Sequence, residues 1–487
     1  MDRGAGTPQD GGAAHQLTDR QRTLAFVTVL IAFVLEVADT TIVNTALPEI
    51  RRALDASSAA MQWIVAGYLL VLGALLLLGG RLGDAFGYRR MFLIGVAGFI
   101  ATSALCGLAQ TPEQLVIGRL LQGAAGAMMG PQVMAIVQTL FSPLERVARL
   151  AWFGVIGGLA AILGPILGGL LIEWNWFGLG WRLIFLINLP IGLIALWLGL
   201  RTIPQRDAGR PLQIDLLGAA LFAAGFAALL FALIDGSEQG WPAWAIPCAL
   251  VGVALVIVGW IRALARRHAG RAAIIEPALF RLTTFRWGLV AVLAFSAGAA
   301  GFLLVLAIAL QQGLAKSPLD TALAHVPFGL GVMAGISLIG KKYLPRLGRW
   351  LLIGGALVMM TGASGALTLI AGGTGGGVGF FALLALAGVG MGMLAGPLPP
   401  IVVADVDRAF AGTASATLRT AQQLGGAIGI AVIGSAYFAA AARTGGALAG
   451  LPVAGALFIV LLLLAILAAW RLPADIFGVR GEKCRRA

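Results

Sequence analysis

The chain has 487 residues, of which 59% are hydrophobic and only 11% charged, and its mean hydropathy is +0.94. Soluble domains carry about 25% charged residues, so this composition excludes a soluble globular protein and indicates an integral membrane protein. The net charge of +13 does not indicate a nucleic-acid partner, because the basic residues lie in short gaps between apolar runs. The three histidines and three cysteines are scattered, without metal-ligand spacing or an obvious disulfide pair.

Apolar runs long enough to cross a membrane recur along the whole chain. A membrane-spanning helix needs about 20 mostly apolar residues, and this criterion predicts fourteen spans. They lie near residues 24–46, 61–80, 91–110, 115–139, 149–172, 181–201, 215–235, 242–262, 285–311, 321–340, 349–371, 377–401, 410–437 and 450–470. Because the number is even, both termini are expected on the same side of the membrane.

The predicted spans divide into six, two and six. We expect an N-terminal tail at 1–23, a six-helix bundle at 24–201, a two-helix insert with its flanking loops at 202–284, a second six-helix bundle at 285–470 and a basic tail at 471–487. A faint repeat supports this division, since "GGRLGDAFGYRR" and "GKKYLPRLGRW" each follow the second span of a bundle. Two similar six-helix halves are common in transporters.

The distribution of Lys and Arg predicts the orientation. If both termini are cytoplasmic, two of the 34 basic residues fall inside spans and most of the others lie in inner segments. The outer segments then hold only Arg51, Arg52, Arg182, Lys316 and Arg443. Cytoplasmic loops of membrane proteins are enriched in Lys and Arg. The sequence therefore predicts a multi-pass protein of a bacterial-type cytoplasmic membrane, with both tails in the cytoplasm.

Four charged residues lie well inside the predicted spans: Glu36, Asp39, Arg119 and Arg419. An ionisable group in the membrane interior is costly and is therefore a candidate functional residue. At about 100° per residue, Glu36, Asp39 and Asn44 share one face of the first span. This polar stripe is expected to face the protein interior rather than lipid.

Depth allows Asp39 to pair with Arg119. At about 1.5 Å per residue, Asp39 lies roughly 22 Å from the inner end of the first span. Arg119 lies roughly 21 Å from the inner face, because the fourth span runs in the opposite direction. Depth alone does not show that the two helices are neighbours. The alternative is a charge network that only fastens helices together.

Glu36 has no cation assigned to it by this argument. Beside Arg119, Asp39 would stay ionised, whereas Glu36 would be buried next to a second carboxylate. The two carboxylates would titrate as a coupled pair, and a proton-driven exchanger needs a site that can take up a proton near neutral pH. We therefore expect Asp39, Glu36 and Arg119 to form the proton-coupling site, with Asp39 as its principal candidate. Alternatively, Glu36 serves mainly to attract cationic substrates.

Seven segments in sequence order carry a resemblance to a known family. They are "ADTTIVNTALP" (38–48), "GGRLGDAFGYRR" (79–90), "GRLLQGAAGA" (118–127), "LGPILGG" (163–169), "WRLIFLINLPIG" (181–192), "LQQGLAKSPLDTALAHVPFGLG" (310–331) and "GTASATLRTAQQLGGAIGIA" (412–431). Together they resemble the fourteen-helix drug:proton antiporters of the major facilitator superfamily. The resemblance implies an all-α membrane protein with that superfamily's fold, two pseudo-symmetric six-helix bundles and a two-helix insert.

The resemblance assigns conformational roles to two segments. In the first, Gly80, Asp84, Gly87 and Arg89 are in register with the superfamily's cytoplasmic-loop motif, which latches the outward-open state in relatives. Asp84 could pair with Arg89 or Arg90, or lie against a helix N-terminus. Tyr88 departs from the family pattern, where a basic residue is usual. The alternative is that these arginines only set the topology.

The second segment resembles the antiporter motif of the fifth helix, in which a bend limits leak and favours exchange over uptake. Its residues are Gly164, Pro165, Gly168 and Gly169. Small residues also let helices approach closely, so ordinary packing is the alternative explanation.

Several polar or aromatic residues inside the expected spans are candidates for lining a substrate cavity. Arg419 departs from the family pattern, which has a neutral polar residue there, and it could pair with an acidic group or contact an anionic part of the substrate. The other candidate substrate-binding residues are Glu36, Asn44, Trp63, Gln311, Gln312 and Gln423. Each glutamine could equally connect helices, and Trp63 could equally belong to the core.

These observations predict a proton-coupled antiporter that exports amphipathic, cationic or neutral small molecules, and not an enzyme. A dedicated exporter of one metabolite or antibiotic, and a uniporter or importer, are alternatives on the same fold. ATP-driven transport is disfavoured because the chain has no "GxxxxGK[ST]" segment. We expect no cofactor, protons as the coupling ion, and a monomer whose partners are its substrate and the lipid bilayer.

Overall fold

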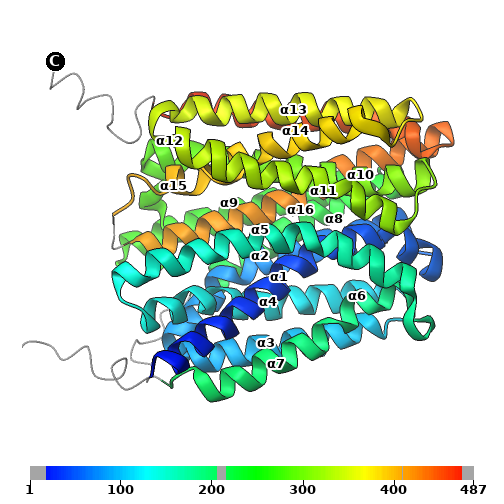
Figure 1. The fold of residues 1–487 in the computed structure, drawn as a ribbon. Helices are drawn as coiled ribbons and strands as arrows, with labels where there is room; N and C mark the ends of the chain where they lie inside the picture. Colours follow the sequence, from blue (N-terminus) through cyan, green and yellow to red (C-terminus); the bar gives the residue numbers. More distant parts are fainter. Residues whose placement is uncertain (1–17, 206–214, 408–409, 474–487) are drawn as a thin grey trace, which may run out of the picture.

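The computed structural model describes residues 18–205, 215–407 and 410–473, and most of the two expected tails lies outside these ranges. Every regular element in the described part is a helix (Figure 1). The longer helices are α1 (Asp19–Leu54), α2 (Ser58–Phe86), α3 (Tyr88–Gly107), α4 (Pro112–Leu140), α5 (Pro143–Trp174), α7 (Asn188–Thr202), α8 (Leu216–Glu238), α9 (Ala245–His268), α10 (Thr283–Ile308), α11 (Pro318–Ala334), α13 (Arg349–Ala371), α14 (Gly377–Ala395), α16 (Ala411–Thr444) and α17 (Leu451–Trp470). The short helices are α6 (Leu183–Leu186), α12 (Lys341–Leu347) and α15 (Leu398–Val402), with η2 (Trp176–Gly178), η3 (Gly180–Arg182), η4 (Pro277–Arg281), η5 (Ala309–Gly313), η6 (Gly335–Gly340) and η8 (Ala447–Gly450).

Thirteen helical segments in the described part are long and apolar enough to cross a membrane. The remaining expected span, near 149–172, lies within the 32-residue helix α5. Two of these segments combine several helical stretches. Gly180–Thr202 is made of η3, α6 and α7, and Gly377–Val402 is made of α14 and α15, which meet at Pro397.

Local sequence signals explain where key helices begin and end. Thr18 forms a capping box with Gln21 at the start of α1, and Ser57 accepts a hydrogen bond from the Ala60 amide at the start of α2. Gly87 (φ 93°) separates α2 from α3, and Gly348 (φ 51°) separates α12 from α13. These two positive-φ glycines lie in the two segments of the faint sequence repeat, and each permits a tight turn that other residues disfavour.

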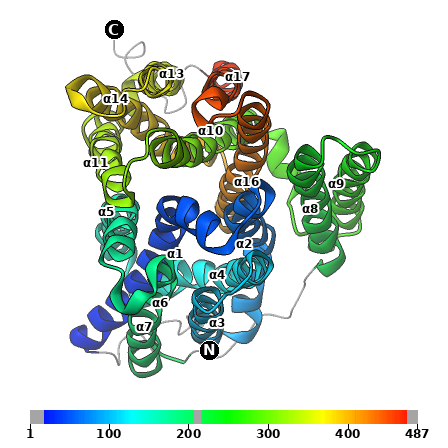
Figure 2. The same cartoon turned by 90° about the vertical axis from the view of Figure 1, so that its right-hand side faces the viewer.

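The helices form two bundles with the same packing scheme. In the first bundle α1 packs on α5 and α7, while α4 packs on α2 and α3. In the second bundle α10 packs on α16 and α17, while α14 packs on α11 and α13. Figure 2 shows the two groups with α8 and α9 to one side. This is the arrangement of two pseudo-symmetric bundles and a two-helix insert that the sequence predicts.

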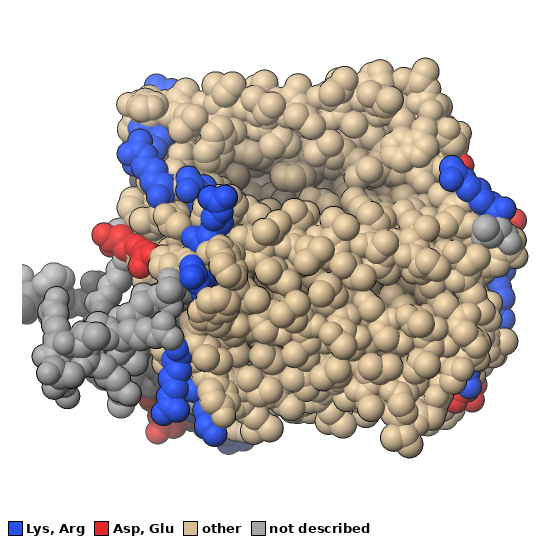
Figure 3. All heavy atoms as spheres, turned by 90° about the horizontal axis from the view of Figure 1, so that it is seen from above, with Lys and Arg blue, Asp and Glu red and all other residues tan. Residues whose placement is uncertain are grey.

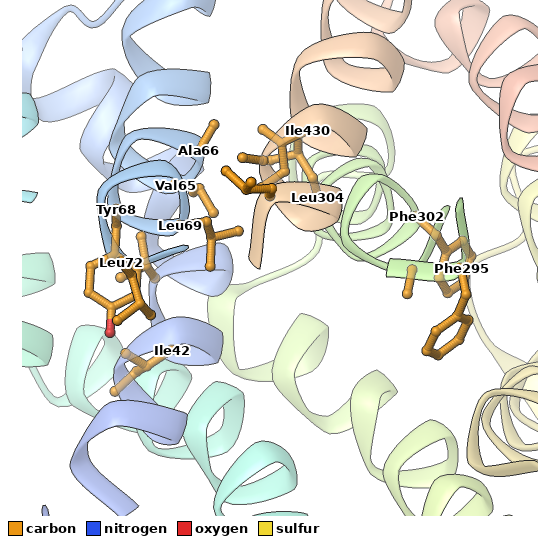
Figure 4. Close-up of a cluster of buried hydrophobic side chains, with 14 of the residues drawn as sticks. Ile42, Val65, Ala66, Tyr68, Leu69, Leu72, Phe295, Phe302, Leu304 and Ile430 are labelled. Atoms are coloured by element: carbon orange, nitrogen blue, oxygen red, sulfur yellow. The ribbon is translucent and has the colours of Figure 1, made fainter. Parts of the chain in front are cut away.

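Two helix pairs form the main contacts between the bundles: α2 with α16, and α5 with α11. We call these pairs the two seams. At the α2–α16 seam, Leu69 lies against Gly426, and Val65 and Leu69 point toward Ile430 (Figure 4). Glycine backbone at such positions lets the helices approach closely.

The insert is attached where α2 meets α16. Glu238 of α8 accepts hydrogen bonds from the Ser57 hydroxyl and the Ala59 amide at the start of α2, at 3.2 and 2.6 Å. The Ser435 hydroxyl of α16 donates to the carbonyl of Leu233 in α8 at 3.1 Å. The insert therefore contacts both bundles rather than serving as a free linker.

The charged side chains lie mainly at the two ends of the bundle. Figure 3 shows Lys and Arg at both ends, with a broad uncharged belt between them. The start of α1 and the end of α17 lie at the same end, on the left in Figure 1, which we call the terminal end. We call the other end the distal end.

Candidate transport site

The centre of the first bundle contains a fully buried ion pair. The Arg119 guanidinium on α4 lies 2.5 Å from the Asp39 carboxylate on α1, and the two side chains are 1% and 0% exposed. The helices that depth alone could not place side by side are therefore neighbours here. Charges in so apolar a region are tolerated only when each is paired and hydrogen-bonded.

Side-chain amides complete the surroundings of Asp39. Gln122 donates to Asp39 Oδ1 at 3.0 Å, and Asn188 donates to the same oxygen at 3.1 Å. Gln122 and Asn188 also donate to the Ser103 hydroxyl, at 2.8 and 3.3 Å. Four helices, α1, α3, α4 and α7, thus supply one connected polar network.

Arg119 is held independently of Asp39 as well. Its Nε donates to the Ile64 carbonyl of α2 at 3.0 Å, and its Nη1 donates to Gln122 at 2.7 Å. Its guanidinium carbon lies 4.1 Å from the centre of the Tyr68 ring, a cation–π contact. With several donors fixed in place, the arginine presents a rigid positive charge to Asp39.

Glu36 is paired with Arg419, so of the two alternatives for Arg419 the structure shows pairing with an acidic group. Arg419 Nη2 lies 2.8 Å from Glu36 Oε1, across 383 residues of sequence. Glu36 belongs to α1 and Arg419 to α16, so this ion pair joins the two bundles. The sequence left open which acid pairs with Arg419, because it does not show which helices of different bundles face each other.

The carboxylates of the two ion pairs differ in how many hydrogen bonds they accept. Asp39 accepts hydrogen bonds from three side chains on both of its oxygens. Glu36 is bound through Oε1, whereas its buried Oε2 has no hydrogen-bond partner in the described part of the chain. Oε2 lies against Gly130 of α4, where an added Cβ would be only 2.8 Å away.

The structure brings some of the other predicted substrate-binding residues to the boundary between the bundles. Asn44 is partly buried on α1, and its Oδ1 has no hydrogen-bond partner in the described residues. Gln311 of η5 donates to the Thr45 carbonyl of α1 at 2.8 Å, and Gln423 of α16 lies against Gly73 of α2.

Two predicted residues lie apart from this group. The Trp63 indole donates to Asp235 of α8 at 2.7 Å, so this side chain helps attach the insert. Gln312 is exposed at the distal end, where Arg51 donates to it at 3.3 Å.

Asp84 pairs with Tyr88 rather than with Arg89 or Arg90, the two partners suggested by the sequence. The Tyr88 hydroxyl donates to Asp84 Oδ1 at 2.7 Å. Arg89 instead donates to the Leu200 carbonyl at the end of α7 and to Gln205, and Arg90 is exposed. Tyr88, which departs from the family pattern, is thus the hydrogen-bond partner of Asp84 in place of an arginine.

Gly80 and Gly87 have different roles in this segment. Gly80 is partly buried, and Pro131 of α4 lies nearest to its missing Cβ, at 3.7 Å. Gly87 occupies the positive-φ turn between α2 and α3.

The glycines of the fifth helix face two different neighbours. A Cβ on Gly164 would lie 2.2 Å from Thr41 Oγ1, and one on Gly168 would lie 2.8 Å from Ile42, both on α1. A Cβ on Gly169 would lie 2.9 Å from Ala322 and from the Pro318 carbonyl, both on α11. Gly169 therefore permits close contact across a seam, whereas Gly164 and Gly168 permit packing inside the first bundle. Pro165 lies within α5 and is buried.

Sequence reasoning did not single out Gln122, Asn188 or Ser103. A signal was present for the first two, because an amide inside an apolar span costs energy unless it is hydrogen-bonded. Gln122 lies one helical turn after Arg119, and Asn188 lies in the sixth predicted span. Among the described residues, no cluster of three or more His, Cys, Asp or Glu side chains could hold a metal ion.

Comparison with known proteins agrees with the fold and the sequence segments. The sequence model of the Major Facilitator Superfamily matches residues 29–430. The chain is 40% identical to a protein described as "Probable actinorhodin transporter" from Streptomyces coelicolor, over 89% of this chain and 75% of that protein. It is 36% identical to "Puromycin resistance protein pur8" from Streptomyces alboniger, over 94% and 92% of the two chains. It is 29% identical to "Multidrug transporter protein MdtP" from Bacillus subtilis, over 85% and 75%.

Solved structures share the fold at low sequence identity. A bacterial homologue of the human lysosomal transporter Spinster, in an inward-facing and unoccupied conformation, matches with a TM-score of 0.65 and 17% identity, covering 94% of this chain and 98% of that one. An auto-inhibited peptide transporter of the POT family matches with a TM-score of 0.61 and 17% identity, covering 96% and 97%. At this identity the likeness concerns the fold alone.

Proposed function

Because this chain belongs to the major facilitator superfamily and is a multi-pass membrane transporter, we propose that it is a proton-coupled antiporter that exports amphipathic small molecules. Relatives are described as transporters, export proteins or resistance proteins for antibiotics, which supports efflux as the direction of transport. The substrates of this proposal are cationic or neutral molecules, and the working unit is a monomer in the lipid bilayer without a nucleic-acid partner.

The observation that carries the proposal is the buried Asp39–Arg119 pair. Antiport requires a group that binds a proton in one conformation and releases it in another. Protonation of Asp39 would remove its charge and leave Arg119 without a counter-ion, so the network would have to rearrange. Such a rearrangement can link proton binding to rocking of one bundle against the other.

The contacts between the bundles support a cycle that starts with the distal end closed. Gln311 to Thr45, Arg51 to Gln312, and α11 against Gly169 all join the bundles in their distal halves. In the proposed orientation the terminal end is cytoplasmic. Substrate would then enter from the cytoplasm, and protons from outside would drive the return to this state.

A dedicated exporter of one natural product is the second candidate function. It is favoured by relatives whose descriptions refer to a single compound, such as actinorhodin, cephamycin or tetracenomycin C. A broad and a dedicated exporter would differ in substrate range rather than in coupling.

Transport into everted membrane vesicles tests the proposal. Respiring vesicles that contain the protein should accumulate ethidium, Nile red or Nε-dansyl-lysine above the level of vesicles without it. Addition of nigericin and valinomycin, which collapse the pH gradient and the membrane potential, should abolish the difference. Accumulation that survives the collapse would contradict proton coupling, and no accumulation of any probe would contradict export of amphipathic molecules. Accumulation of one probe class alone would favour the dedicated exporter.

A further inference from the structure

We propose that the exported molecule is zwitterionic and binds by inserting between Glu36 and Arg419, its anionic group replacing Glu36 on Arg419 and its cationic group replacing Arg419 on Glu36. This inference rests on the proposed export function and assigns the substrate class of the same site.

The position of the pair is that of a ligand site. Glu36 comes from the first bundle and Arg419 from the second, so a molecule held between the bundles would contact both. Arg419 lies about 12 Å from the start of α16, well inside the predicted span. Its side chain is nevertheless 29% exposed. An arginine facing lipid at this depth would be costly, so its exposed part must face open space inside the protein.

The pair is also less tightly held than its neighbour. Arg419 contacts one oxygen of Glu36, and the buried Oε2 has no hydrogen-bond partner among the described residues. A guanidinium can bind a carboxylate through two parallel hydrogen bonds, and a carboxylate can accept several. A ligand could therefore offer each partner more hydrogen bonds than the two residues offer each other.

Charge balance selects the class of ligand. Removing one partner of a buried ion pair leaves an uncompensated charge, which costs far more than the intact pair contributes. A purely cationic ligand bound to Glu36 would leave Arg419 unpaired, and a purely anionic ligand bound to Arg419 would leave Glu36 unpaired. A ligand that carries both charges leaves neither residue without a partner. The adjacent Asp39–Arg119 pair is already neutral and offers no compensating charge.

Four forms of one fluorescent scaffold provide the test. Nε-dansyl-lysine is a zwitterion, its amide is a cation, its Nα-acetyl derivative is an anion, and its Nα-acetyl amide is neutral. Dansyl fluorescence reports binding to the purified protein in detergent, without any gradient. We expect the wild type to bind the zwitterion at least about ten-fold more tightly than each of the other three forms.

Variants should change which form is preferred. Arg419→Gln keeps the acid alone and should favour the cation, whereas Glu36→Gln keeps the arginine alone and should favour the anion. The double variant Glu36→Gln/Arg419→Gln carries neither charge, so it should bind the four forms alike. It also serves as the control for the single variants, because it has no unpaired charge that could cause misfolding. The inference is overturned if the wild type shows no preference for the zwitterion, or if the single variants keep the wild-type order.

Transport separates this inference from the proposed function. If the zwitterion binds preferentially but its accumulation in vesicles persists without a gradient, the binding site stands and proton coupling fails. If accumulation depends on the gradient but all four forms are transported equally, coupling stands and the zwitterion site is wrong.

Discussion

Asp39 and Glu36 lie one helical turn apart on α1, yet their surroundings suit them to different tasks. Asp39 is enclosed by donors from its own bundle, whereas Glu36 reaches into the second bundle. Because all the partners of Asp39 belong to one bundle, they stay beside it when the two bundles rock against each other, so Asp39 can serve as a proton site throughout the cycle. A group paired across the bundles must separate from its partner when a ligand enters between them.

Replacement of Asp39 tests the first of these roles. Asp39→Asn leaves Arg119 buried without a counter-ion, so we expect gradient-driven accumulation to fall by more than about ten-fold. We also expect a lower thermal unfolding temperature in detergent, because breaking a buried pair costs about 3–5 kcal/mol. The matched variant Asp39→Asn/Arg119→Gln removes both charges and should regain stability without regaining transport. Normal gradient-dependent transport by this double variant would mean that the pair only fastens helices together.

At the scale of helices, the sequence predicts the number and the approximate bounds of the spans, because the bilayer sets their length and hydropathy. For example, the expected span at 349–371 coincides with α13. The division of Gly180–Thr202 and Gly377–Val402 into shorter helical stretches was not predicted, because span length and hydropathy do not resolve changes of helix type within one span. The pairing of Asp39 with Arg119 could be anticipated from depth, but depth could not show that Arg419 faces Glu36 from another bundle.

The close contact between α5 and α11 depends on two missing side chains, those of Gly169 on α5 and of Gly329 on α11, where an added Cβ would lie 2.2 Å from Ile162. Gly169→Val would place atoms within 3 Å of Ala322 and of the Pro318 carbonyl, and overpacking of this kind costs about 1–3 kcal/mol. Overpacking destabilises only the conformation in which α5 and α11 are in contact at the distal end. We therefore expect the population of molecules to shift toward a conformation with an open distal end. Spin labels at Trp174, the last residue of α5, and at Lys316, two residues before α11, should report longer distances in this variant.

A matched substitution controls for the loss of glycine itself. Gly379→Val introduces the same side chain on α14, where an added Cβ meets nothing within 4 Å. This control should leave the distance distribution and the transport rate unchanged. Equal distances in the wild type and Gly169→Val would show that the α5–α11 contact does not decide whether the distal end is closed.

For the whole molecule, the direction of transport depends on which end faces the cytoplasm. The excess of Lys and Arg in the expected inner segments predicts a cytoplasmic terminal end. Arg20 is exposed at that end, and Val378, 88% exposed, lies at the distal end. Single cysteines can be placed at these two positions in a chain whose native Cys106, Cys248 and Cys484 have been replaced.

We expect a membrane-impermeant maleimide to label Val378→Cys and not Arg20→Cys in intact cells, and the reverse in everted vesicles. The physical reason is that positively charged loops are retained in the cytoplasm during insertion. The inverted pattern would place the closed distal end in the cytoplasm. An inward proton gradient would then meet the open end first, and the cycle proposed for export would have to run as import.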